Sequence, residues 1–101
     1  MKTLKLQFVG VKGPVLPADE MTGDPETGIK VVDNDREIAL ANLECGLAYL
    51  VYCTFKEKGK LELLKQQKEE VFRILEEIKE RLIEINDGSF VVEDMISDKD
   101  F

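Results

Sequence analysis

The first hydrophobic pattern in the chain is a short alternation of apolar and polar residues. Leu4, Leu6 and Phe8 alternate with polar side chains, which is the period-two pattern of a half-buried β-strand. Glycines and prolines follow, so we expect this strand to end by Val11. The apolar run at residues 29–32 predicts a short second strand, and we expect it to pair antiparallel with the first.

A helix is predicted to begin at about Asp35. Asn34 and Glu37 are three residues apart and resemble a capping box, with Asp33 or Asn34 as the N-cap. The helical pattern then continues to Lys58. This first helix is therefore expected to be more than twenty residues long.

Gly59 divides the helical pattern into two helices, because it fits the left-handed position at which many helices end. A second helix is expected from about Leu61 to Ile85. Since the connection is so short, the two helices must lie side by side and antiparallel. The turn residues 86–88 stop the second helix, and residues 89–92 are expected to form a third strand.

The two predicted helices differ in how their apolar residues are distributed. The second helix has one apolar seam with charged residues around it, so a single neighbour can bury it. In the first helix, only four residues between Ile38 and Phe55 are not hydrophobic, and a helix that is apolar nearly all round must be buried nearly all round. The residues of the seam are Leu61, Leu64, Val71, Leu75, Ile78, Leu82 and Ile85.

The first helix is expected to lie at a subunit interface, because one neighbour in the hairpin cannot cover it. A glycine in mid-helix costs about 1 kcal/mol relative to alanine, so Gly46 is expected to let another backbone approach, within the hairpin or across an interface. A membrane span is disfavoured, since the segment is short and contains Glu44. The predicted interface residues are Leu40, Leu43, Gly46, Leu47, Leu50, Tyr49 and Tyr52.

The net charge of -7 is concentrated outside the helices. It argues against nucleic acid or an anionic membrane as a direct partner, because both are themselves negatively charged. A basic protein surface remains a candidate partner for the turn-rich loop at residues 17–28 and for the acidic tail. The candidate partner-binding acids are Asp19, Glu20, Asp24, Glu26, Glu93, Asp94, Asp98 and Asp100.

The residues needed for common catalytic chemistry are scarce. The chain has no histidine, which removes the usual general base near neutral pH and the commonest zinc ligand. Cys45 and Cys53 are eight residues apart, or about 12 Å along a helix, too far for a disulfide. We expect buried thiols in a reducing cytoplasm, no secretory signal peptide, no cofactor and no enzymatic activity.

Asp33, Asp35, Glu37 and Glu44 match four ligand positions of a calcium-binding EF-hand loop. The glycine that the loop requires is replaced by Ile38, and acids near a helix start explain the first three residues without a metal. We therefore predict no metal site.

Glu44 is unusual because it is an isolated acid in an apolar helix. It has three interpretations: a solvent-exposed stripe with Glu37, a buried pair with Arg73 or Lys68, or a polar contact in a ligand pocket with the tyrosines.

Together these patterns predict an α+β fold in one domain over residues 1–101. A β/loop region (1–32) precedes the helical hairpin (33–86), and a short strand with an acidic tail (87–101) follows. The favoured function is a soluble, non-enzymatic interaction module that self-associates through the hairpin, most simply as a dimer. The alternatives are an acidic inhibitor or decoy, of the kind that phages and mobile elements encode, and a small-molecule-binding protein with a pocket between subunits.

Overall fold

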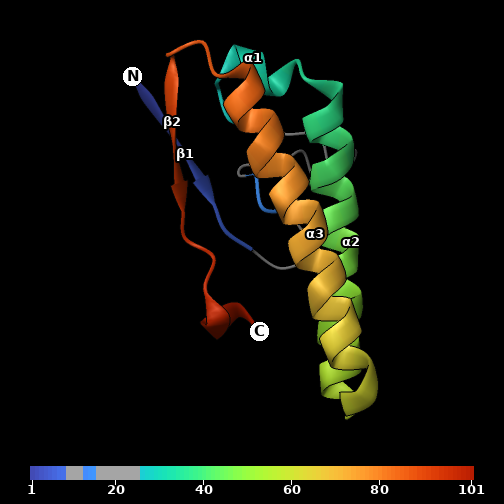
Figure 1. Ribbon diagram of the computed structural model, residues 1–101. Helices are drawn as coiled ribbons and strands as arrows, with labels where there is room; N and C mark the ends of the chain where they lie inside the picture. The colour runs from blue at the N-terminus through green and yellow to red at the C-terminus, as the bar shows by residue number, and fades with distance from the viewer. Residues whose placement is uncertain (9–12, 16–25) are drawn as a thin grey trace.

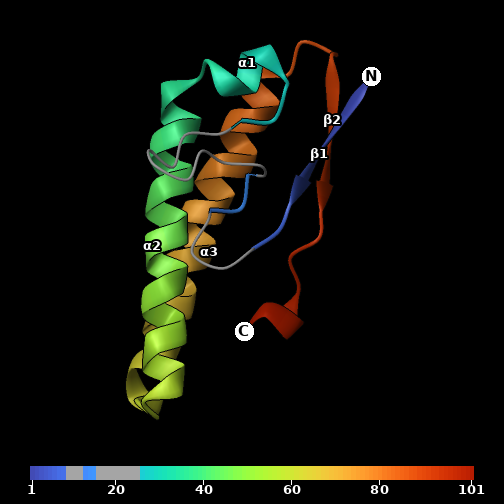
Figure 2. The same ribbon diagram turned by 180° about the vertical axis from the view of Figure 1, so that it is seen from behind.

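Two long helices lie side by side, and a pair of strands lies to one side of them (Figures 1 and 2). The computed structural model describes residues 1–8, 13–15 and 26–101. The predicted α+β class with two packed long helices is confirmed. The elements in chain order are β1 (Lys2–Leu6), α1 (Lys30–Asp33), α2 (Arg36–Glu57), α3 (Leu61–Ile85), β2 (Phe90–Asp94) and the 3-10 turn η1 (Asp98–Asp100).

The first long helix begins at Arg36, one residue after the predicted start at about Asp35. Asp35 is the N-cap of α2, and its carboxylate accepts a hydrogen bond of 3.0 Å from the Ile38 backbone N–H. The predicted caps at Asp33 or Asn34 are therefore wrong. At the other end, Gly59 has a φ of 72°, so it takes the left-handed conformation that the sequence predicted there.

The strand predicted at residues 29–32 is wrong, because this segment forms the helical turn α1. Ile29 and Val32 are both buried, and residues three apart share a face in a helix but not in a strand. The carboxylate of Asp33 accepts hydrogen bonds from the Thr27 backbone N–H at 2.7 Å and from its hydroxyl at 3.0 Å. This local loop outweighs the β propensity of two adjacent valines.

The strands β1 and β2 pair parallel, with Lys2 opposite Phe90 and Leu6 opposite Asp94. Within the described residues the sheet has two strands, so the predicted antiparallel pairing near the N-terminus is wrong. The strand predicted at residues 89–92 is present, slightly displaced. The pairing is parallel because α2 and α3 bring the chain back to the end of the molecule where β1 begins (Figure 1).

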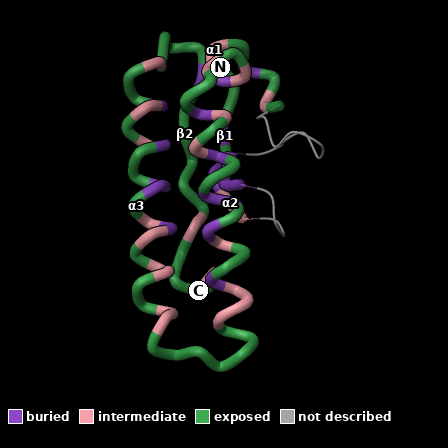
Figure 3. Tube along the Cα trace, turned by 90° about the vertical axis from the view of Figure 1, so that its right-hand side faces the viewer, coloured by how far each residue is buried: buried purple, intermediate pink, exposed green. Residues whose placement is uncertain are grey.

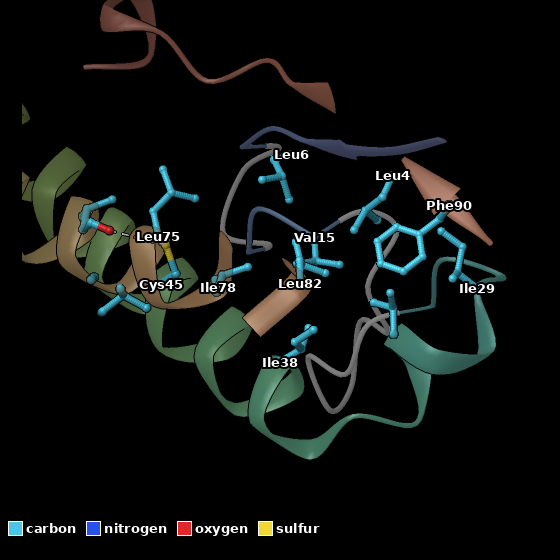
Figure 4. Packing of buried hydrophobic residues seen from close by; sticks show 14 residues of the cluster. Leu4, Leu6, Val15, Ile29, Ile38, Cys45, Leu75, Ile78, Leu82 and Phe90 are labelled. Atoms are coloured by element: carbon cyan, nitrogen blue, oxygen red, sulfur yellow. Dashed lines mark hydrogen bonds between the residues drawn. The ribbon is translucent and has the colours of Figure 1, made fainter. Parts of the chain in front are cut away.

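The hydrophobic core lies between the strands and the helices. Leu4 and Phe90 point from the two strands toward Ile29 and Leu82, while Cys45 of α2 lies near Leu75 of α3 (Figure 4). The buried positions of α3 lie on the side that faces α2, and its opposite side is exposed (Figure 3). The largest side chains that are almost wholly buried include Phe90, Leu4, Leu6, Ile38, Leu75, Ile78 and Leu82.

The turn end of the hairpin extends past the strands (Figures 1 and 2). For this reason the predicted seam of α3 is buried over only part of its length. Val71, Leu75, Ile78 and Leu82 are at most 1% exposed, whereas Leu61, at the turn, is 75% exposed.

Candidate interaction surface

One side of α2 carries a row of leucines that no part of the described chain fully covers. Leu40 is 56% exposed, Leu47 is 54% exposed, and Leu43 and Leu50 are each 41% exposed. They follow one another at steps of three, four and three residues, which places them along one line of a helix. We call these residues, together with the 40% exposed Val51, the outer face of α2.

The opposite side of α2 is buried within the chain. The predicted interface set is thus divided between two sides of the helix: its four leucines lie on the outer face, whereas Gly46 and Tyr52 are buried and Tyr49 is half-buried. The buried residues of α2 are Ile38, Asn42, Cys45, Gly46, Ala48 and Tyr52.

Another backbone approaches α2 closely at Asn42, four residues before Gly46, and it comes from the same chain. The Val15 N–H donates a hydrogen bond of 2.8 Å to the Asn42 side-chain oxygen. A Cβ atom on Gly13 would lie 2.2 Å from the Asn42 backbone oxygen, so only glycine fits there. The segment 13–15 therefore packs directly on α2.

Acidic residues gather at the start of α2, and lysines gather at its end. Glu37, beside the start of the helix, is exposed, and Asp33 and Asp35 lie just before it. The Arg81 guanidinium of α3 lies 2.8 Å from the Asp35 carboxylate and 3.3 Å from that of Glu37, so it balances part of this negative charge. The end of α2 carries three exposed bases, Lys56, Lys58 and Lys60, beside Glu57. The outer face thus runs from an end with three acids against Arg36 and Arg81 to an end with three lysines against Glu57.

Glu44 is exposed, so the interpretation of a buried acid is wrong. The hydrogen bond that Arg73 donates to Glu70 is the main cause that raises the pKa of Arg73, and the carboxylates of Glu77 and Glu44 add to it, so Glu44 lies close to α3. The prediction that Glu44 shares a solvent stripe with Glu37 agrees with this exposure.

An aromatic cluster that the sequence did not predict closes the other flank of α2. The rings of Phe8 and Tyr49 are stacked with centroids 4.0 Å apart. The ring of Phe101 lies 5.6 Å from Tyr49, 5.2 Å from Tyr52 and 4.9 Å from Phe72. Only the excess of aromatic residues on α2 hinted at such a cluster, because Phe101 is about fifty residues away in sequence.

The hydroxyl groups of the two tyrosines hold the C-terminal segment. Tyr49 donates to the Asp100 carbonyl oxygen at 2.6 Å, and Tyr52 donates to the Phe101 carbonyl oxygen at 2.7 Å. Burial, together with the neighbouring Cys53 and Asp100, raises the pKa of Tyr49 to about 12. These hydroxyls are therefore engaged, and the structure does not bring them together with Glu44 in a ligand pocket.

Several of the candidate partner-binding acids have contacts within the chain. Asp94 lies 2.6 Å from the Lys79 ammonium, and Asp98 lies 3.9 Å from that of Lys68. The Asp100 carboxylate accepts a hydrogen bond from the Ser97 backbone N–H. Glu26 and Glu93 are exposed, and Asp19, Glu20 and Asp24 lie outside the described residues.

Neither cysteine takes part in a disulfide. Cys45 is buried and Cys53 is half-buried, and burial raises the pKa of Cys45 to about 12. In the part of the chain that the structure describes, no three acids or cysteines are grouped so that they could hold a metal ion.

Among the helices of the described chain, α2 alone is long and apolar enough to cross a membrane. This criterion uses length and composition only. The core helix of a soluble protein meets it as well, and 33% of the apolar stretch of α2 is buried inside the molecule. The finding therefore identifies α2 as the most apolar helix without assigning it to a membrane.

Comparison with models of known protein families found no match. Searches against curated proteins and against solved structures also found no significant similarity.

Proposed function

We propose that this chain is a small, non-enzymatic interaction module that self-associates through the outer face of α2. The observation that carries the proposal is the row Leu40, Leu43, Leu47 and Leu50, which stays 41% to 56% exposed although the opposite side of the helix is buried. An exposed apolar patch of this regularity is typical of a surface that a partner covers.

The spacing of the leucines favours another helix as the partner. Steps of three and four residues form the seam along which two helices interlock their side chains. A second copy of α2 supplies the same spacing, and an interface related by a two-fold axis uses one patch on both subunits. A dimer is the simplest assembly in which these four leucines become buried.

The chemistry of the chain supports a binding role more than a catalytic one. There is no histidine in the sequence, and the two tyrosine hydroxyls are engaged by backbone carbonyl oxygens. We propose that the module requires no cofactor or metal. The free thiols of Cys45 and Cys53 favour the reducing cytoplasm as its location.

The two alternative functions have less support. Asp94, Asp98 and Asp100 have partners within the chain, which leaves fewer tail acids for a decoy of the phage type to present to a basic surface. A ligand pocket between subunits would need polar groups on the outer face, and its five residues are all apolar.

The proposal is tested by sedimentation velocity at protein concentrations from about 5 to about 500 μM, which spans micromolar to submillimolar affinity. We expect the mass of the wild-type chain to rise to that of a dimer. Leu47→Gln should shift this transition to higher concentration by roughly tenfold or more, because it places an amide in an apolar contact. Leu61→Gln is the matched control, since Leu61 is exposed but lies outside the outer face.

Two outcomes would count against the proposal. The first is a wild-type chain that stays monomeric over the whole range. The second is a wild-type chain that sediments with neutral phosphatidylcholine vesicles while the Leu47→Gln variant does not. The outer face would then contact lipid and not a second copy of the chain.

A further inference from the structure

The outer face alone is compatible with two orientations of a second copy. Leu40 and Leu50 are equally far from position 45, as are Leu43 and Leu47. Every leucine therefore meets a leucine whether the two helices run parallel, each residue facing its own counterpart, or antiparallel about Cys45. The choice must come from what surrounds the leucines.

The charges at the ends of α2 differ between these two orientations. In a parallel pair, the acidic residues near Glu37 meet the same acids of the partner, and the lysines near Lys58 meet the same lysines. In an antiparallel pair the acidic end lies beside the partner's basic end. Arg36 also then lies near the partner's Glu57 instead of near its own counterpart. Opposite charges favour the antiparallel pair, and like charges at both ends disfavour the parallel one.

The helix dipoles act in the same direction. Each α2 has a partial positive charge at its start and a partial negative charge at its end. Side-by-side dipoles attract when they run in opposite directions and repel when they run in the same direction. For a helix of about 33 Å this term is small and screened by salt, yet it adds to the preference set by the side chains.

The described elements that pack on α2 leave room for this arrangement. The residues of α2 that are buried within the chain, Ile38, Cys45 and Tyr52 among them, mark the side where α3 and the strands pack. The leucines are exposed, and their spacing places them on the opposite side of the helix.

Resting on the proposed self-association, we infer that two copies pair their α2 helices antiparallel about a two-fold axis that crosses the outer face at the level of position 45. Leu40 then faces the partner's Leu50, and Leu43 faces the partner's Leu47. The ligand of the outer face is a second copy of this chain in one orientation and one register.

Engineered disulfides distinguish the two orientations. In the antiparallel pair, position 40 lies beside the partner's position 50, while the two copies of position 40 are about 15 Å apart along the axis. In the parallel pair these relations are reversed. A disulfide needs Cα atoms within about 7 Å, so each orientation links a different pair.

The experiment uses the full chain with Cys53→Ser to remove the half-buried thiol. Cys45 is kept, because it is buried and its pKa of about 12 keeps it as an unreactive thiol. Leu40→Cys and Leu50→Cys are made in separate chains, one of which carries a mass tag. The chains are studied alone and mixed, in a glutathione redox buffer, and the products are identified by mass.

We expect the mixture to form the 40–50 disulfide in at least several-fold excess over the 40–40 and 50–50 disulfides. Dominant 40–40 and 50–50 products would overturn the inference in favour of a parallel pair and leave self-association intact. A dimer by sedimentation that forms none of these disulfides would overturn the register. Chains that remain monomeric would overturn both the inference and the proposed function.

Two charge variants give a second readout by sedimentation. Glu44 lies on the outer face's flank, near the inferred axis, so it approaches the partner's Glu44 in the antiparallel pair. Glu44→Gln should therefore tighten the dimer by roughly two- to fivefold. Glu37→Gln should weaken it by up to about twofold, because it removes an acid that lies about 7.5 Å along the axis from the partner's Lys58. In a parallel pair Glu37→Gln would tighten the dimer instead, which would overturn the inference.

Discussion

The two long helices are similar in length but bury their apolar residues differently. The buried residues of α3 lie on one side, and its charged residues lie on the other, where Arg73 contacts Glu70 and Glu77. The helix α2 is packed on one side by α3, the strands and the C-terminal segment, yet it retains leucines on the other side. The difference shows that one buried side accommodates most of the apolar residues of an amphipathic helix, whereas a helix that is apolar nearly all round keeps apolar residues exposed on its other side.

The largest expected difference between the two helices appears when one leucine in each is truncated to alanine. Leu82 of α3 is 1% exposed, and Leu47 of α2 is 54% exposed. We expect Leu82→Ala to lower the free energy of unfolding by about 2–5 kcal/mol, because it leaves a cavity in the core. We expect Leu47→Ala to lower it by less than about 1 kcal/mol at concentrations where the chain is monomeric. Urea denaturation followed by circular dichroism measures both, and equal losses would contradict the two-sided description of α2.

The contact between α2 and the C-terminal segment is tested by truncating its aromatic anchor. Phe101→Ala removes the ring that lies against Tyr49, Tyr52 and Phe72. We expect a loss of about 2 kcal/mol in the free energy of unfolding, less than for a fully buried phenylalanine because Phe101 is half-buried. The tyrosine fluorescence should change as well. Lys99→Ala is the control on the same segment, and a similar loss there would argue against the anchoring role.

The start of α2 is linked to α3 through Asp35, whose side chain is 8% exposed and lies 2.8 Å from Arg81. Asp35→Ala should cost about 1–2 kcal/mol, since it removes both the helix cap and an ion pair. Asp35→Asn should cost less, because asparagine is also a good cap. Thermal unfolding of both variants separates the two contributions.

The same residue predicts a pH dependence. Burial raises the pKa of Asp35, but the hydrogen bonds from the Arg81 guanidinium and the Ile38 N–H together lower it by more. The pKa therefore lies below its usual value of 3.8. A lowered pKa in the folded state stabilises the fold above the usual pKa, and this stabilisation is lost as the pH falls through the lower value. We expect Asp35→Asn to flatten the decline of stability below about pH 4. An unchanged acid profile would contradict this assignment.

The smallest expected effect concerns the contact of α3 with β2. The side chains of Lys79 and Asp94 are 29% and 39% exposed, so solvent screens their ion pair. A double-mutant cycle with Lys79→Met and Asp94→Asn should give a coupling energy of about 0.5 kcal/mol or less. A coupling energy several times larger would mean that this ion pair contributes substantially to holding α3 against β2, in addition to the buried apolar contacts of α3.

Much of the fold followed from local patterns. The ends of α3, the turn at Gly59 and the presence of a strand at Leu4 and Leu6 and another near residues 89–92 were predicted correctly, because helix periodicity, strand alternation and turn chemistry act over a few residues. The prediction failed at residues 29–32, where a β-like composition was overridden by the hydrogen bonds of Asp33 and by the burial of residues three apart.

The candidate surface was predicted only in part. The over-apolar character of α2 was evident from composition, and all four leucines of the outer face were in the expected set. Gly46, Tyr49 and Tyr52 were assigned to the same surface, but they face the interior or the C-terminal segment. Composition measures how apolar a helix is, and it does not reveal which of its sides the rest of the chain will cover.

The order of residues along the chain was therefore enough to establish two helices, their lengths and the need of α2 for more than one neighbour. These properties depend on spacings of three or four residues. Tertiary structure alone decided that the strands run parallel, that Phe101 packs on α2, and that the leucine row of α2 faces outward. Each of those depends on segments tens of residues apart that meet only when the core forms, so no local pattern encodes them.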